Sequence, residues 1–356
     1  MTELAPITGA CAWLGTDIAR SSRWVRDLEP ADISEIDAAL AGVERRGLAW
    51  HETTRANFPL PKLADLLSDI ADELENGCGM MKLRGLPVGR YSEDQLRKLY
   101  FGLGANLGTP VFQNRSGELM RQIRDEGADV GKKYGQIERV RMTDGKPFLS
   151  SYARTLSNGA LRFHTDRTDV VALLCVRQAA KGGVSTICSS VSVMNEMLKR
   201  RPDLCALLFA PYYRSRHGEE SETAENVYAL PIFGVRDGRF TSHFSLTYIE
   251  AAQTVAGIPT MSAAQKEGLD MLLSLAKELA FEMTLEPGDV QLLNSHVTYH
   301  GRTPFEDDAT SGQDRLLMRL WLAMPNSRAL PKGQEVLWRN IEAGALRGGI
   351  AQTAPR

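Results

Sequence analysis

The chain has 356 residues, of which 43% are hydrophobic and 24% charged, a composition typical of a soluble globular protein with a large core. The formal net charge is −2 and neither sign forms a long run, so nucleic acid is not an expected partner. The longest apolar stretch, residues 170–176, is far shorter than the roughly 20 residues that a membrane helix needs. These features predict a single domain over residues 1–356, with no membrane partner.

The N-terminus and the cysteines bear on the cellular compartment. Residues 1–20 lack a basic region followed by an apolar core, so they do not resemble a secretion signal. The cysteines are odd in number and include no Cys-x-x-Cys pair, which argues against a disulfide framework or a thiolate zinc site. We expect buried, reduced thiols and a cytoplasmic protein. The oligomeric state stays open, a homo-oligomer included. The five cysteines are Cys11, Cys78, Cys175, Cys188 and Cys205.

The first part of the chain is predicted to form a helical layer. Apolar residues recur at three- and four-residue spacings over residues 30–45, 60–75 and 92–107. Between the last two helices, residues 79–86 alternate in polarity and are bounded by glycines, which indicates a short strand.

From about Leu161 the pattern changes to short β-type runs, which predict a sandwich or barrel. The Asp237-Gly238 pair indicates a hairpin, and residues 286–289 indicate a turn before the strand that leads to His300. The tail after Pro331 is expected to be peripheral. Strands are predicted at 169–176, 185–189, 227–235, 239–244, 281–285, 290–294 and 316–323, with helices at 191–199, 202–208 and 262–279.

A metal site is suggested by His164-Thr165-Asp166, because residues i and i+2 of a strand point to the same side. Two histidines of the segment 294–307, His296 and His300, could supply a third ligand, and strand parity does not choose between them. Two histidines and one carboxylate on one face of an iron(II) ion leave three adjacent positions open for a cosubstrate and dioxygen.

Two arginines are expected beside this site. If the loop at residues 306–313 is the tip of a hairpin centred near Ala309, His300 pairs with Arg319 on a face shared with Arg315. Buried arginines need acidic partners or anionic ligands, and a dicarboxylate cosubstrate would be one. The alternative is pairing with structural acids such as Asp307 or Asp314.

These residues belong to a set of motifs by which the chain resembles the TauD/TfdA (taurine dioxygenase-like) family of the clavaminate synthase-like superfamily. The resemblance runs from about Gly79 to Ala323 and implies a double-stranded β-helix, a jelly-roll (cupin-like) core with a flanking helical layer. The motifs are Met81-Lys82-Leu83-Arg84-Gly85-Leu86-Pro87, Leu107-Gly108-Thr109-Pro110, Phe163-His164-Thr165-Asp166, Gly182-Gly183-Val184-Ser185, Pro287-Gly288-Asp289, His300-Gly301-Arg302-Thr303-Pro304-Phe305 and Arg315-Leu316-Leu317-Met318-Arg319.

The resemblance implies that His164, Asp166 and His300 are the iron(II) ligands. The His-Gly-Arg context favours His300 over His296, which becomes a residue that lines or supports the site. The role of Arg302 stays open, because it could support Asp307 or only stabilise the hairpin.

The resemblance also implies cosubstrate and substrate contacts. Arg315 matches the arginine that binds the distal carboxylate of 2-oxoglutarate, and Ser185 or Thr186 supplies a hydroxyl to the same group. Arg319 and Gln113 match positions that contact substrate in some members. Where some relatives have a histidine beside Gln113 this chain has none, so a sulfonate or phenoxy acid substrate is not assumed.

The implied activity is an iron(II)-, 2-oxoglutarate- and O2-dependent dioxygenase that releases succinate and CO2. Hydroxylation of an unactivated C–H bond is the default outcome, and Asp166 argues against halogenation because related halogenases lack that ligand. Demethylation, desaturation and ring formation stay open, because they use the same ligands. Arg319 and Arg167 favour a small acidic or zwitterionic substrate. The alternatives are a non-redox β-barrel that binds a metal or small molecule, and a zinc or manganese hydrolase or isomerase on the same fold.

Overall fold

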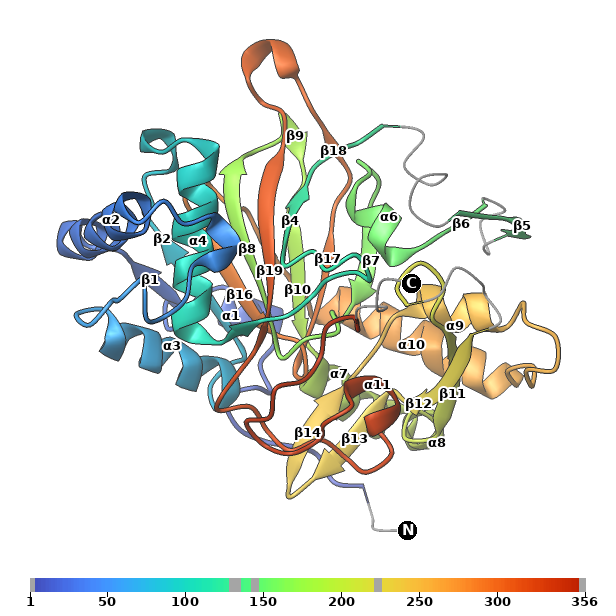
Figure 1. Ribbon diagram of the computed structural model, residues 1–356. Helices are drawn as coiled ribbons and strands as arrows, with labels where there is room; N and C mark the ends of the chain where they lie inside the picture. Colours follow the sequence, from blue (N-terminus) through green and yellow to red (C-terminus); the bar gives the residue numbers. More distant parts are fainter. Residues whose placement is uncertain (1–3, 128–135, 142–146, 221–225, 352–356) are drawn as a thin grey trace.

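The computed structural model describes residues 4–127, 136–141, 147–220 and 226–351, and two facing sheets form its centre (Figure 1). In these residues β1 and β2 pair in parallel, and the other pairings in the two sheets are antiparallel. The jelly-roll prediction is confirmed. In spatial order the major sheet contains β1 (Val25–Asp27), β2 (Met80–Arg84), β16 (Val290–Asn294), β8 (Val170–Arg177), β19 (Leu316–Ala323) and β3 (Thr109–Pro110), with β4 (Met120–Ile123) also on β19; the minor sheet contains β15 (Phe281–Met283), β10 (Ser185–Ser189), β17 (Thr298–Arg302) and β7 (Leu161–His164).

Both faces of the major sheet are covered, which explains why β8 up to Val176 and β19 apart from Arg319 are apolar. On β19, Leu317 and Trp321 pack between the two sheets, whereas Met318 and Leu320 pack under the helical layer. Strand alternation therefore directs Arg319 between the sheets.

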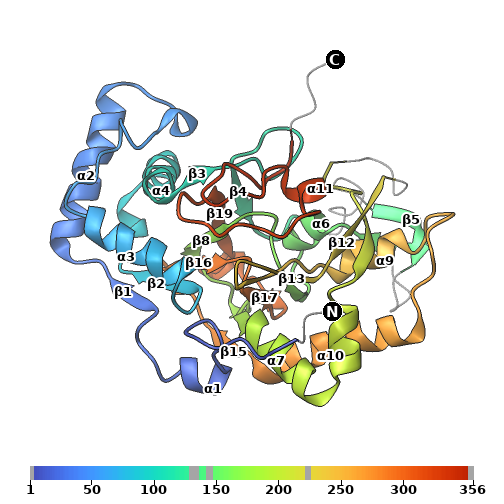
Figure 2. The ribbon, with the colours of Figure 1, turned by 90° about the horizontal axis from the view of Figure 1, so that it is seen from below.

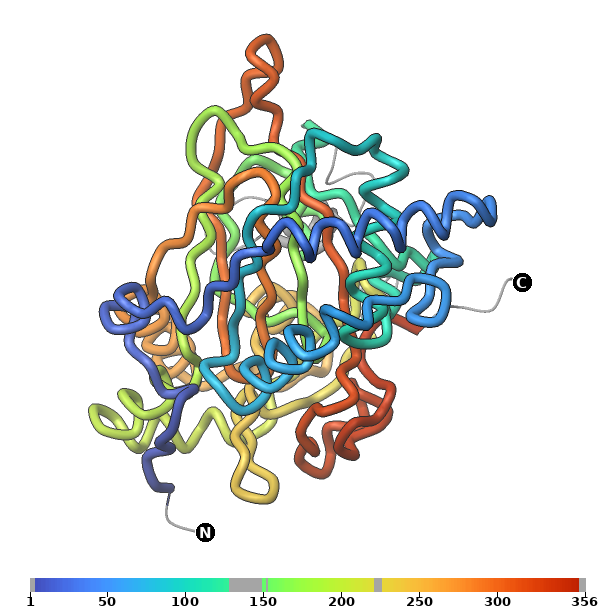
Figure 3. Tube along the Cα trace, turned by 90° about the vertical axis from the view of Figure 1, so that its left-hand side faces the viewer, coloured from blue at the N-terminus to red at the C-terminus, as the bar shows by residue number. Residues whose placement is uncertain are grey.

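The helical layer consists of α2 (Pro30–Arg45), α3 (Ala64–Glu75) and α4 (Glu93–Leu107), which lie over the outer face of the major sheet (Figures 2 and 3). Two of these helices begin with a capping box, which is formed by Glu29 and Asp32 in α2 and by Ser92 and Gln95 in α4. The three helices predicted from periodicity all form, with α3 four residues shorter at its start than expected.

Helices also cover the outer face of the minor sheet. There α7 (Ser190–Arg200), α8 (Pro202–Leu207) and α10 (Ala263–Leu279) share a core with Cys188 and Tyr299 of β10 and β17. The other elements are α1 (Gly15–Ile18), α6 (Ser151–Thr155), α9 (Leu246–Ala252), α11 (Glu335–Trp338), β5 (Gln136–Arg141), β6 (Pro147–Leu149), β9 (Lys181–Gly182), β11 (Pro211–Ser215), β12 (Val227–Pro231), β13 (Phe233–Arg236), β14 (Arg239–Ser242), β18 (Phe305–Glu306), and short 3-10 turns at Trp50–Glu52, Val88–Arg90 and Ala309–Ser311.

The predicted strand at 227–235 is broken at Ile232, and its two parts pair with different partners, β12 with β11 and β13 with β14. The hairpin predicted at Asp237-Gly238 is confirmed. Both residues have positive φ, 52° and 75°, as the favoured two-residue hairpin turn requires.

The expected hairpin between the strands of His300 and Arg319 is wrong. The two segments are joined by one β-bridge, between Asp308 and Gln313, and beyond it they separate. Strand β17 joins the minor sheet and β19 joins the major sheet. His300 and Arg319 thus reach the same interior from opposite sheets.

The C-terminal segment is not peripheral as expected. Trp338 and Arg347 are each 1% exposed, as is Ile350, so this segment is part of the core. Among the described helices, none combines the length and the apolar character needed to cross a bilayer.

Candidate metal centre

The structure brings His164, Asp166 and His300 together between the sheets. His164 ends β7 and is the register partner of His300 on β17, while Asp166 lies two residues beyond the strand. The candidate ligand atoms all lie within 4.8 Å of one another. The Nε2 atom of His164 is 3.8 Å from Oδ1 of Asp166, and that of His300 is 4.0 Å from Oδ2. One metal ion can contact all three residues.

The two imidazoles are oriented for metal binding. Nδ1 of His164 lies 2.9 Å from the carbonyl oxygen of Arg162, so its Nε2 atom is the one directed to the metal. Burial, reinforced by His164, lowers the pKa of His300 to about 3, so the ring of His300 is neutral. Two imidazoles and one carboxylate form the donor set of a facial iron(II) site.

Two side chains of β19 hold the Asp166 carboxylate in place. The Nε1 atom of Trp321 donates a hydrogen bond to Oδ2 at 3.0 Å, and Nη1 of Arg319 lies 3.7 Å from the same atom. Burial favours the neutral acid, but Arg319 and the nearby imidazoles outweigh it and lower the pKa of Asp166. The carboxylate is therefore charged and ready to bind a cation.

The three residues line one side of a small pocket between the sheets, with a cavity volume of about 40 Å3. Its polar lining contains more cations than anions, because three arginines and one carboxylate face it. Aliphatic side chains of both sheets complete the wall. The lining residues are Ile123, Thr155, Leu161, His164, Asp166, Val171, Leu173, Ser185, Gln291, His300, Gly301, Arg302, Arg315, Leu317 and Arg319.

Arg315 is the pocket's candidate anion contact. It is 6% exposed, and its Nη1 atom has no hydrogen-bond partner among the described residues. Burial lowers the pKa of Arg315 to about 10, and Phe305 packs 5.1 Å from the guanidinium carbon. The expected acid, Asp307, accepts a hydrogen bond from the backbone N–H of Arg315 at 2.9 Å. A buried guanidinium of this kind fits a carboxylate ligand.

A second guanidinium beside Arg315 belongs to Arg302. Its Nη2 atom donates to the carbonyl oxygens of Ser157 and Gly159 at 2.6 and 2.5 Å, and not to Asp307. Nε and Nη1 of Arg302 are buried without partners among the described residues. Burial, reinforced by Arg315, lowers the pKa of Arg302 to about 9. Arg302 thus ties β17 to the loop before β7 and adds positive charge to the pocket.

Ser185 and Thr186 are neighbours on β10, so strand alternation directs their hydroxyl groups to opposite faces of the sheet. Ser185 lines the pocket and Thr186 does not. Gln291 also lines it, with an Oε1 atom that has no partner among the described residues, and the sequence analysis missed this residue. One signal was present in the sequence, since Gln291 is a polar residue between the apolar residues Val290 and Leu292 of β16.

Two residues expected to contact substrate are absent from the lining. Gln113 is 2% exposed, and its Oε1 atom accepts a hydrogen bond from Nε of Arg319 at 2.7 Å. Its Nε2 atom donates to the carbonyl oxygens of Arg319 and Leu119 at 2.8 and 3.1 Å. Arg167 instead forms an ion pair with Glu220 and donates to the carbonyl oxygen of Leu337 at 2.7 Å. In this structure both have structural partners.

The competing histidine, His296, is fully buried away from the triad. Its Nε2 atom lies 2.8 Å from Oδ1 of Asp169, and its Nδ1 atom lies 3.0 Å from Oγ1 of Thr241. Both ring nitrogens are used, so His296 has no free lone pair to offer the metal. His300 is the histidine that joins His164 and Asp166.

The chain is similar in sequence to known proteins. Residues 44–321 match the family model "Taurine catabolism dioxygenase TauD, TfdA family". The chain is 29% identical over 330 residues to FR-33289 synthase of Streptomyces rubellomurinus, covering 92% of this chain and 93% of that one. It is 26% identical over 313 residues to taurine hydroxylase-like protein SAT17 of Stachybotrys chartarum, covering 87% and 77%.

Solved structures show the same fold. An asparagine oxygenase in complex with Fe(II), 2S,3S-3-hydroxyasparagine and succinate superposes with a TM-score of 0.60 at 16% identity, over 91% of this chain and all of that one. The non-heme iron oxygenase OrfP in complex with Fe and alpha-ketoglutaric acid gives 0.58 at 18% identity, over 84% and 93%. The chain belongs to the TauD/TfdA family of iron(II)- and 2-oxoglutarate-dependent dioxygenases.

Proposed function

We propose that the protein is a single-domain dioxygenase that hydroxylates an unactivated C–H bond of a small acidic or zwitterionic molecule. His164, Asp166 and His300 would hold the iron, and Arg315 would bind the distal carboxylate of 2-oxoglutarate with help from Ser185. The observation that carries this assignment is that the His-Asp-His cluster and the unpaired buried guanidinium of Arg315 line the same pocket.

Iron bound there supplies the dioxygen chemistry that couples decarboxylation of the cosubstrate to oxidation of the substrate. The chain's own residues position the reactants and exclude water. Leu161, Val171, Leu173 and Leu317 form a dry wall around the polar groups, in which each charge interaction is stronger than in water. Arg319 and Trp321 fix the carboxylate that would complete the iron site.

The charge of the pocket supports an acidic substrate. Three guanidinium groups face a single carboxylate, Asp166, so a ferrous ion and a doubly negative cosubstrate still leave positive charge in excess. A further anionic group would reduce the cost of burying that charge. One related protein has a name that fits an acidic substrate. This protein, from an Amycolatopsis species and 24% identical over 190 residues, is named uridine-5'-phosphate dioxygenase.

Anaerobic titration tests the metal and cosubstrate assignment. We expect a weak metal-to-ligand charge-transfer band only when iron(II) and 2-oxoglutarate are both present, and its loss in His164→Ala and His300→Ala. The control is His51→Ala, which removes an exposed histidine outside the triad and should retain the band. A band that survives in His300→Ala and disappears in His296→Ala would transfer the ligand role to His296.

Substrate-dependent succinate release tests the substrate class. A panel should pair small acids and amino acid derivatives with their neutral amides or esters. We expect stimulation by the anionic or zwitterionic member of each pair. Stimulation by neutral lipophilic compounds alone would contradict the proposal. Activity that persists without oxygen and ignores 2-oxoglutarate would instead indicate a hydrolase or isomerase.

We also propose a cytoplasmic location. It is supported by the five cysteines, which are free thiols in the structure, four of them buried.

A further inference from the structure

The chain continues beyond the jelly roll in a segment that the family match does not include. The match ends at residue 321, whereas residues 324–350 fold back beneath the sheets. Six apolar side chains of this segment are buried, together with the guanidinium of Arg347, which is 1% exposed. The apolar side chains are Met324, Leu330, Leu337, Trp338, Ile341 and Ile350.

This segment contacts the residue that directly follows Asp166. The backbone N–H of Gly349 donates to the carbonyl oxygen of Arg167 at 2.7 Å. In return, Nη2 of Arg167 donates to the carbonyl oxygen of Leu337 at 2.7 Å. Arg167 is thereby fixed through its backbone and its side chain.

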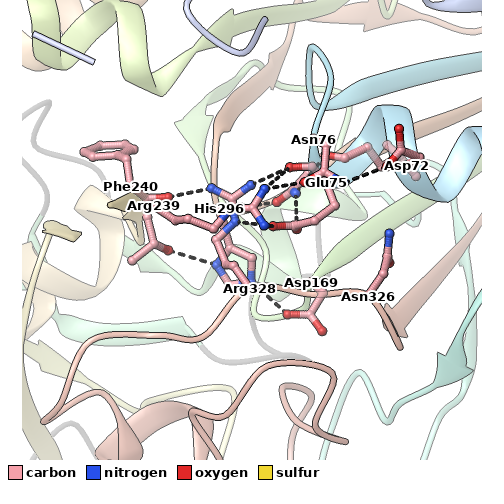
Figure 4. Close-up of polar contacts among 12 residues, drawn as sticks. Asp72, Glu75, Asn76, Asp169, Arg239, Phe240, His296, Asn326 and Arg328 are labelled. Carbon is pink, nitrogen blue, oxygen red and sulfur yellow. Dashed lines mark hydrogen bonds and ion pairs between the residues drawn. The ribbon is translucent and has the colours of Figure 1, made fainter. Parts of the chain in front are cut away.

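The same segment also holds Asp169, three residues after Asp166. Nε of Arg347 donates to Oδ1 of Asp169 at 2.8 Å, and the backbone N–H of Met324 donates to Oδ2 at 3.0 Å. Oδ1 also lies 2.8 Å from Nε2 of His296, as Figure 4 shows. Asp169 is 2% exposed, so breaking these contacts would leave a buried charge unpaired.

The segment is itself anchored to distant parts of the fold. Arg347 donates to the carbonyl oxygen of Arg328 at 2.7 Å. Arg328 in turn bonds Glu75 at the end of α3 and the carbonyl oxygen of Phe240, at 2.8 and 2.6 Å (Figure 4). Trp338 packs against the ring of His296 with 4.9 Å between centroids. These contacts connect the residues after Asp166 to the helical layer.

We propose that residues 324–350 are a brace that positions the Asp166 carboxylate for metal binding, with Gly348 and Arg347 as its positioning residues. This rests on the proposed role of Asp166 as an iron ligand. Asp166 has Trp321 and Arg319 on one side, and the brace fixes the backbone that follows it. Displacing that backbone moves the third ligand away from the two histidines and weakens metal binding.

Gly348 gives the direct test, because it lies against the backbone of Arg167 and Thr168, which follow Asp166 in the chain. Its φ is +73°, and a Cβ there would lie 2.9 Å from the carbonyl oxygen of Arg167 and 3.1 Å from Cα of Thr168. Gly348→Ala therefore pushes on the segment that carries Asp166. We expect the apparent Kd for iron(II), from the anaerobic charge-transfer band with saturating 2-oxoglutarate, to rise roughly ten-fold.

Two glycines outside the brace serve as controls. Gly47→Ala places Ala at φ +65° with nothing within 4 Å of the new Cβ. Gly102→Ala places a Cβ 2.5 Å from the ring of Phe58, a clash inside the helical layer. Melting of the metal-free proteins reports the general loss of stability. We expect Gly102→Ala to lower the Tm as Gly348→Ala does, while both controls keep the iron(II) Kd of the unchanged protein.

A second pair of variants decides the matter if Gly348→Ala does not fold. Arg347→Met removes the donor to Asp169, and Arg347→Lys restores a charged donor. We expect weaker iron(II) binding in Arg347→Met and recovery of most of it in Arg347→Lys. Iron(II) binding that is unaltered in a folded Gly348→Ala protein, equally weakened in Gly102→Ala, or no better in Arg347→Lys than in Arg347→Met overturns the brace. Unaltered binding in Asp166→Ala would instead overturn the ligand assignment.

Discussion

Gln113 and Arg319 are joined twice across the buried end of the major sheet. Nε of Arg319 donates to Oε1 of Gln113 at 2.7 Å, and Nε2 of Gln113 donates to the backbone carbonyl of Arg319 at 2.8 Å. The planar amide thus fixes the guanidinium whose Nη1 lies 3.7 Å from Asp166. Gln113 is thus connected to the candidate metal site through Arg319.

Replacing Gln113 with Met should weaken the site without removing a ligand. The change leaves Nε of Arg319 buried and unpaired, which costs about 1–3 kcal/mol of stability, and frees its guanidinium to move relative to Asp166. We expect a lower Tm and an iron(II) affinity reduced roughly ten-fold. Gln122→Met, which removes an amide bonded to Glu93 at the surface, is the control. Equal iron(II) affinities in the two variants would contradict this role.

Arg315→Ala should raise the KM for 2-oxoglutarate strongly. Losing a charge-assisted contact to a carboxylate costs about 1.5–3 kcal/mol, which corresponds to a roughly 10- to 150-fold weaker interaction. Initial rates at varied 2-oxoglutarate and saturating iron(II) measure the effect. Arg315→Lys keeps the charge but not the planar guanidinium. Its KM for 2-oxoglutarate should lie between those of the unchanged protein and Arg315→Ala.

Gly183 offers an independent test of Arg315 that leaves the guanidinium in place. A Cβ at this position, where φ is +69°, would lie 3.1 Å from Nε of Arg315 and 3.3 Å from Cδ. We expect Gly183→Ala to raise the KM for 2-oxoglutarate by displacing the side chain. In Gly238→Ala the φ is a similar +75° but the Cβ meets nothing within 4 Å, so its KM should stay constant. A KM that rises in both variants would point to a general strain effect.

Ser185 and Thr186 make a matched pair on one strand. Ser185 lines the pocket and is 6% exposed, whereas Thr186 lies on the opposite face of β10. If Ser185 donates to the cosubstrate, Ser185→Ala loses one hydrogen bond of about 1 kcal/mol, a roughly five-fold higher KM for 2-oxoglutarate. Thr186→Val should have no such effect. The reverse result would place the hydroxyl contact at Thr186.

Much of the local structure could be predicted from the sequence for one physical reason. Alternation along a strand and periodicity along a helix are local properties, so the helices α2 and α10 and the strands β8 and β19 are readable from their own residues. The same rule put His164 and Asp166 on one strand, but β7 ends at His164, so the two side chains converge through the turn that follows the strand and not through alternation.

Long-range pairing was the part that local patterns could not supply. The strands of His300 and Arg319 are neighbours in sequence, yet β17 pairs with β10 and β7, and β19 pairs with β8. The partner with which a strand pairs depends on competition among distant segments of the chain. The residues that connect β17 and β19 carry no information about that competition. The inward direction of Arg315 and Arg319 was nevertheless correct, because alternation within β19 does not depend on its partner.

The roles of the other polar residues depended on contacts with distant segments. Arg167 follows Asp166 directly, and its side chain meets Glu220 and the carbonyl oxygen of Leu337. Gln113 meets Arg319, which is 206 residues away. No spacing rule in the sequence connects residues so far apart.

His296 should make the stability of the metal-free protein depend on pH. Burial lowers the pKa of His296 to about 4, against the partial opposition of Asp169, while the unfolded chain binds the proton near pH 6.5. Between these values the unfolded state holds more protons than the folded state, so stability falls as the pH is lowered from 6.5 to 4. The contribution of one such group is about 1.4 kcal/mol per pH unit.

His296→Gln retains a donor for Asp169 but does not titrate, so its unfolding free energy should vary less steeply over this window. His51→Gln, which removes an exposed imidazole, is the control and should follow the slope of the unchanged protein. Denaturant unfolding in the presence of a chelator measures all three, and parallel curves for His296→Gln and the unchanged protein would show that His296 is protonated in the folded state.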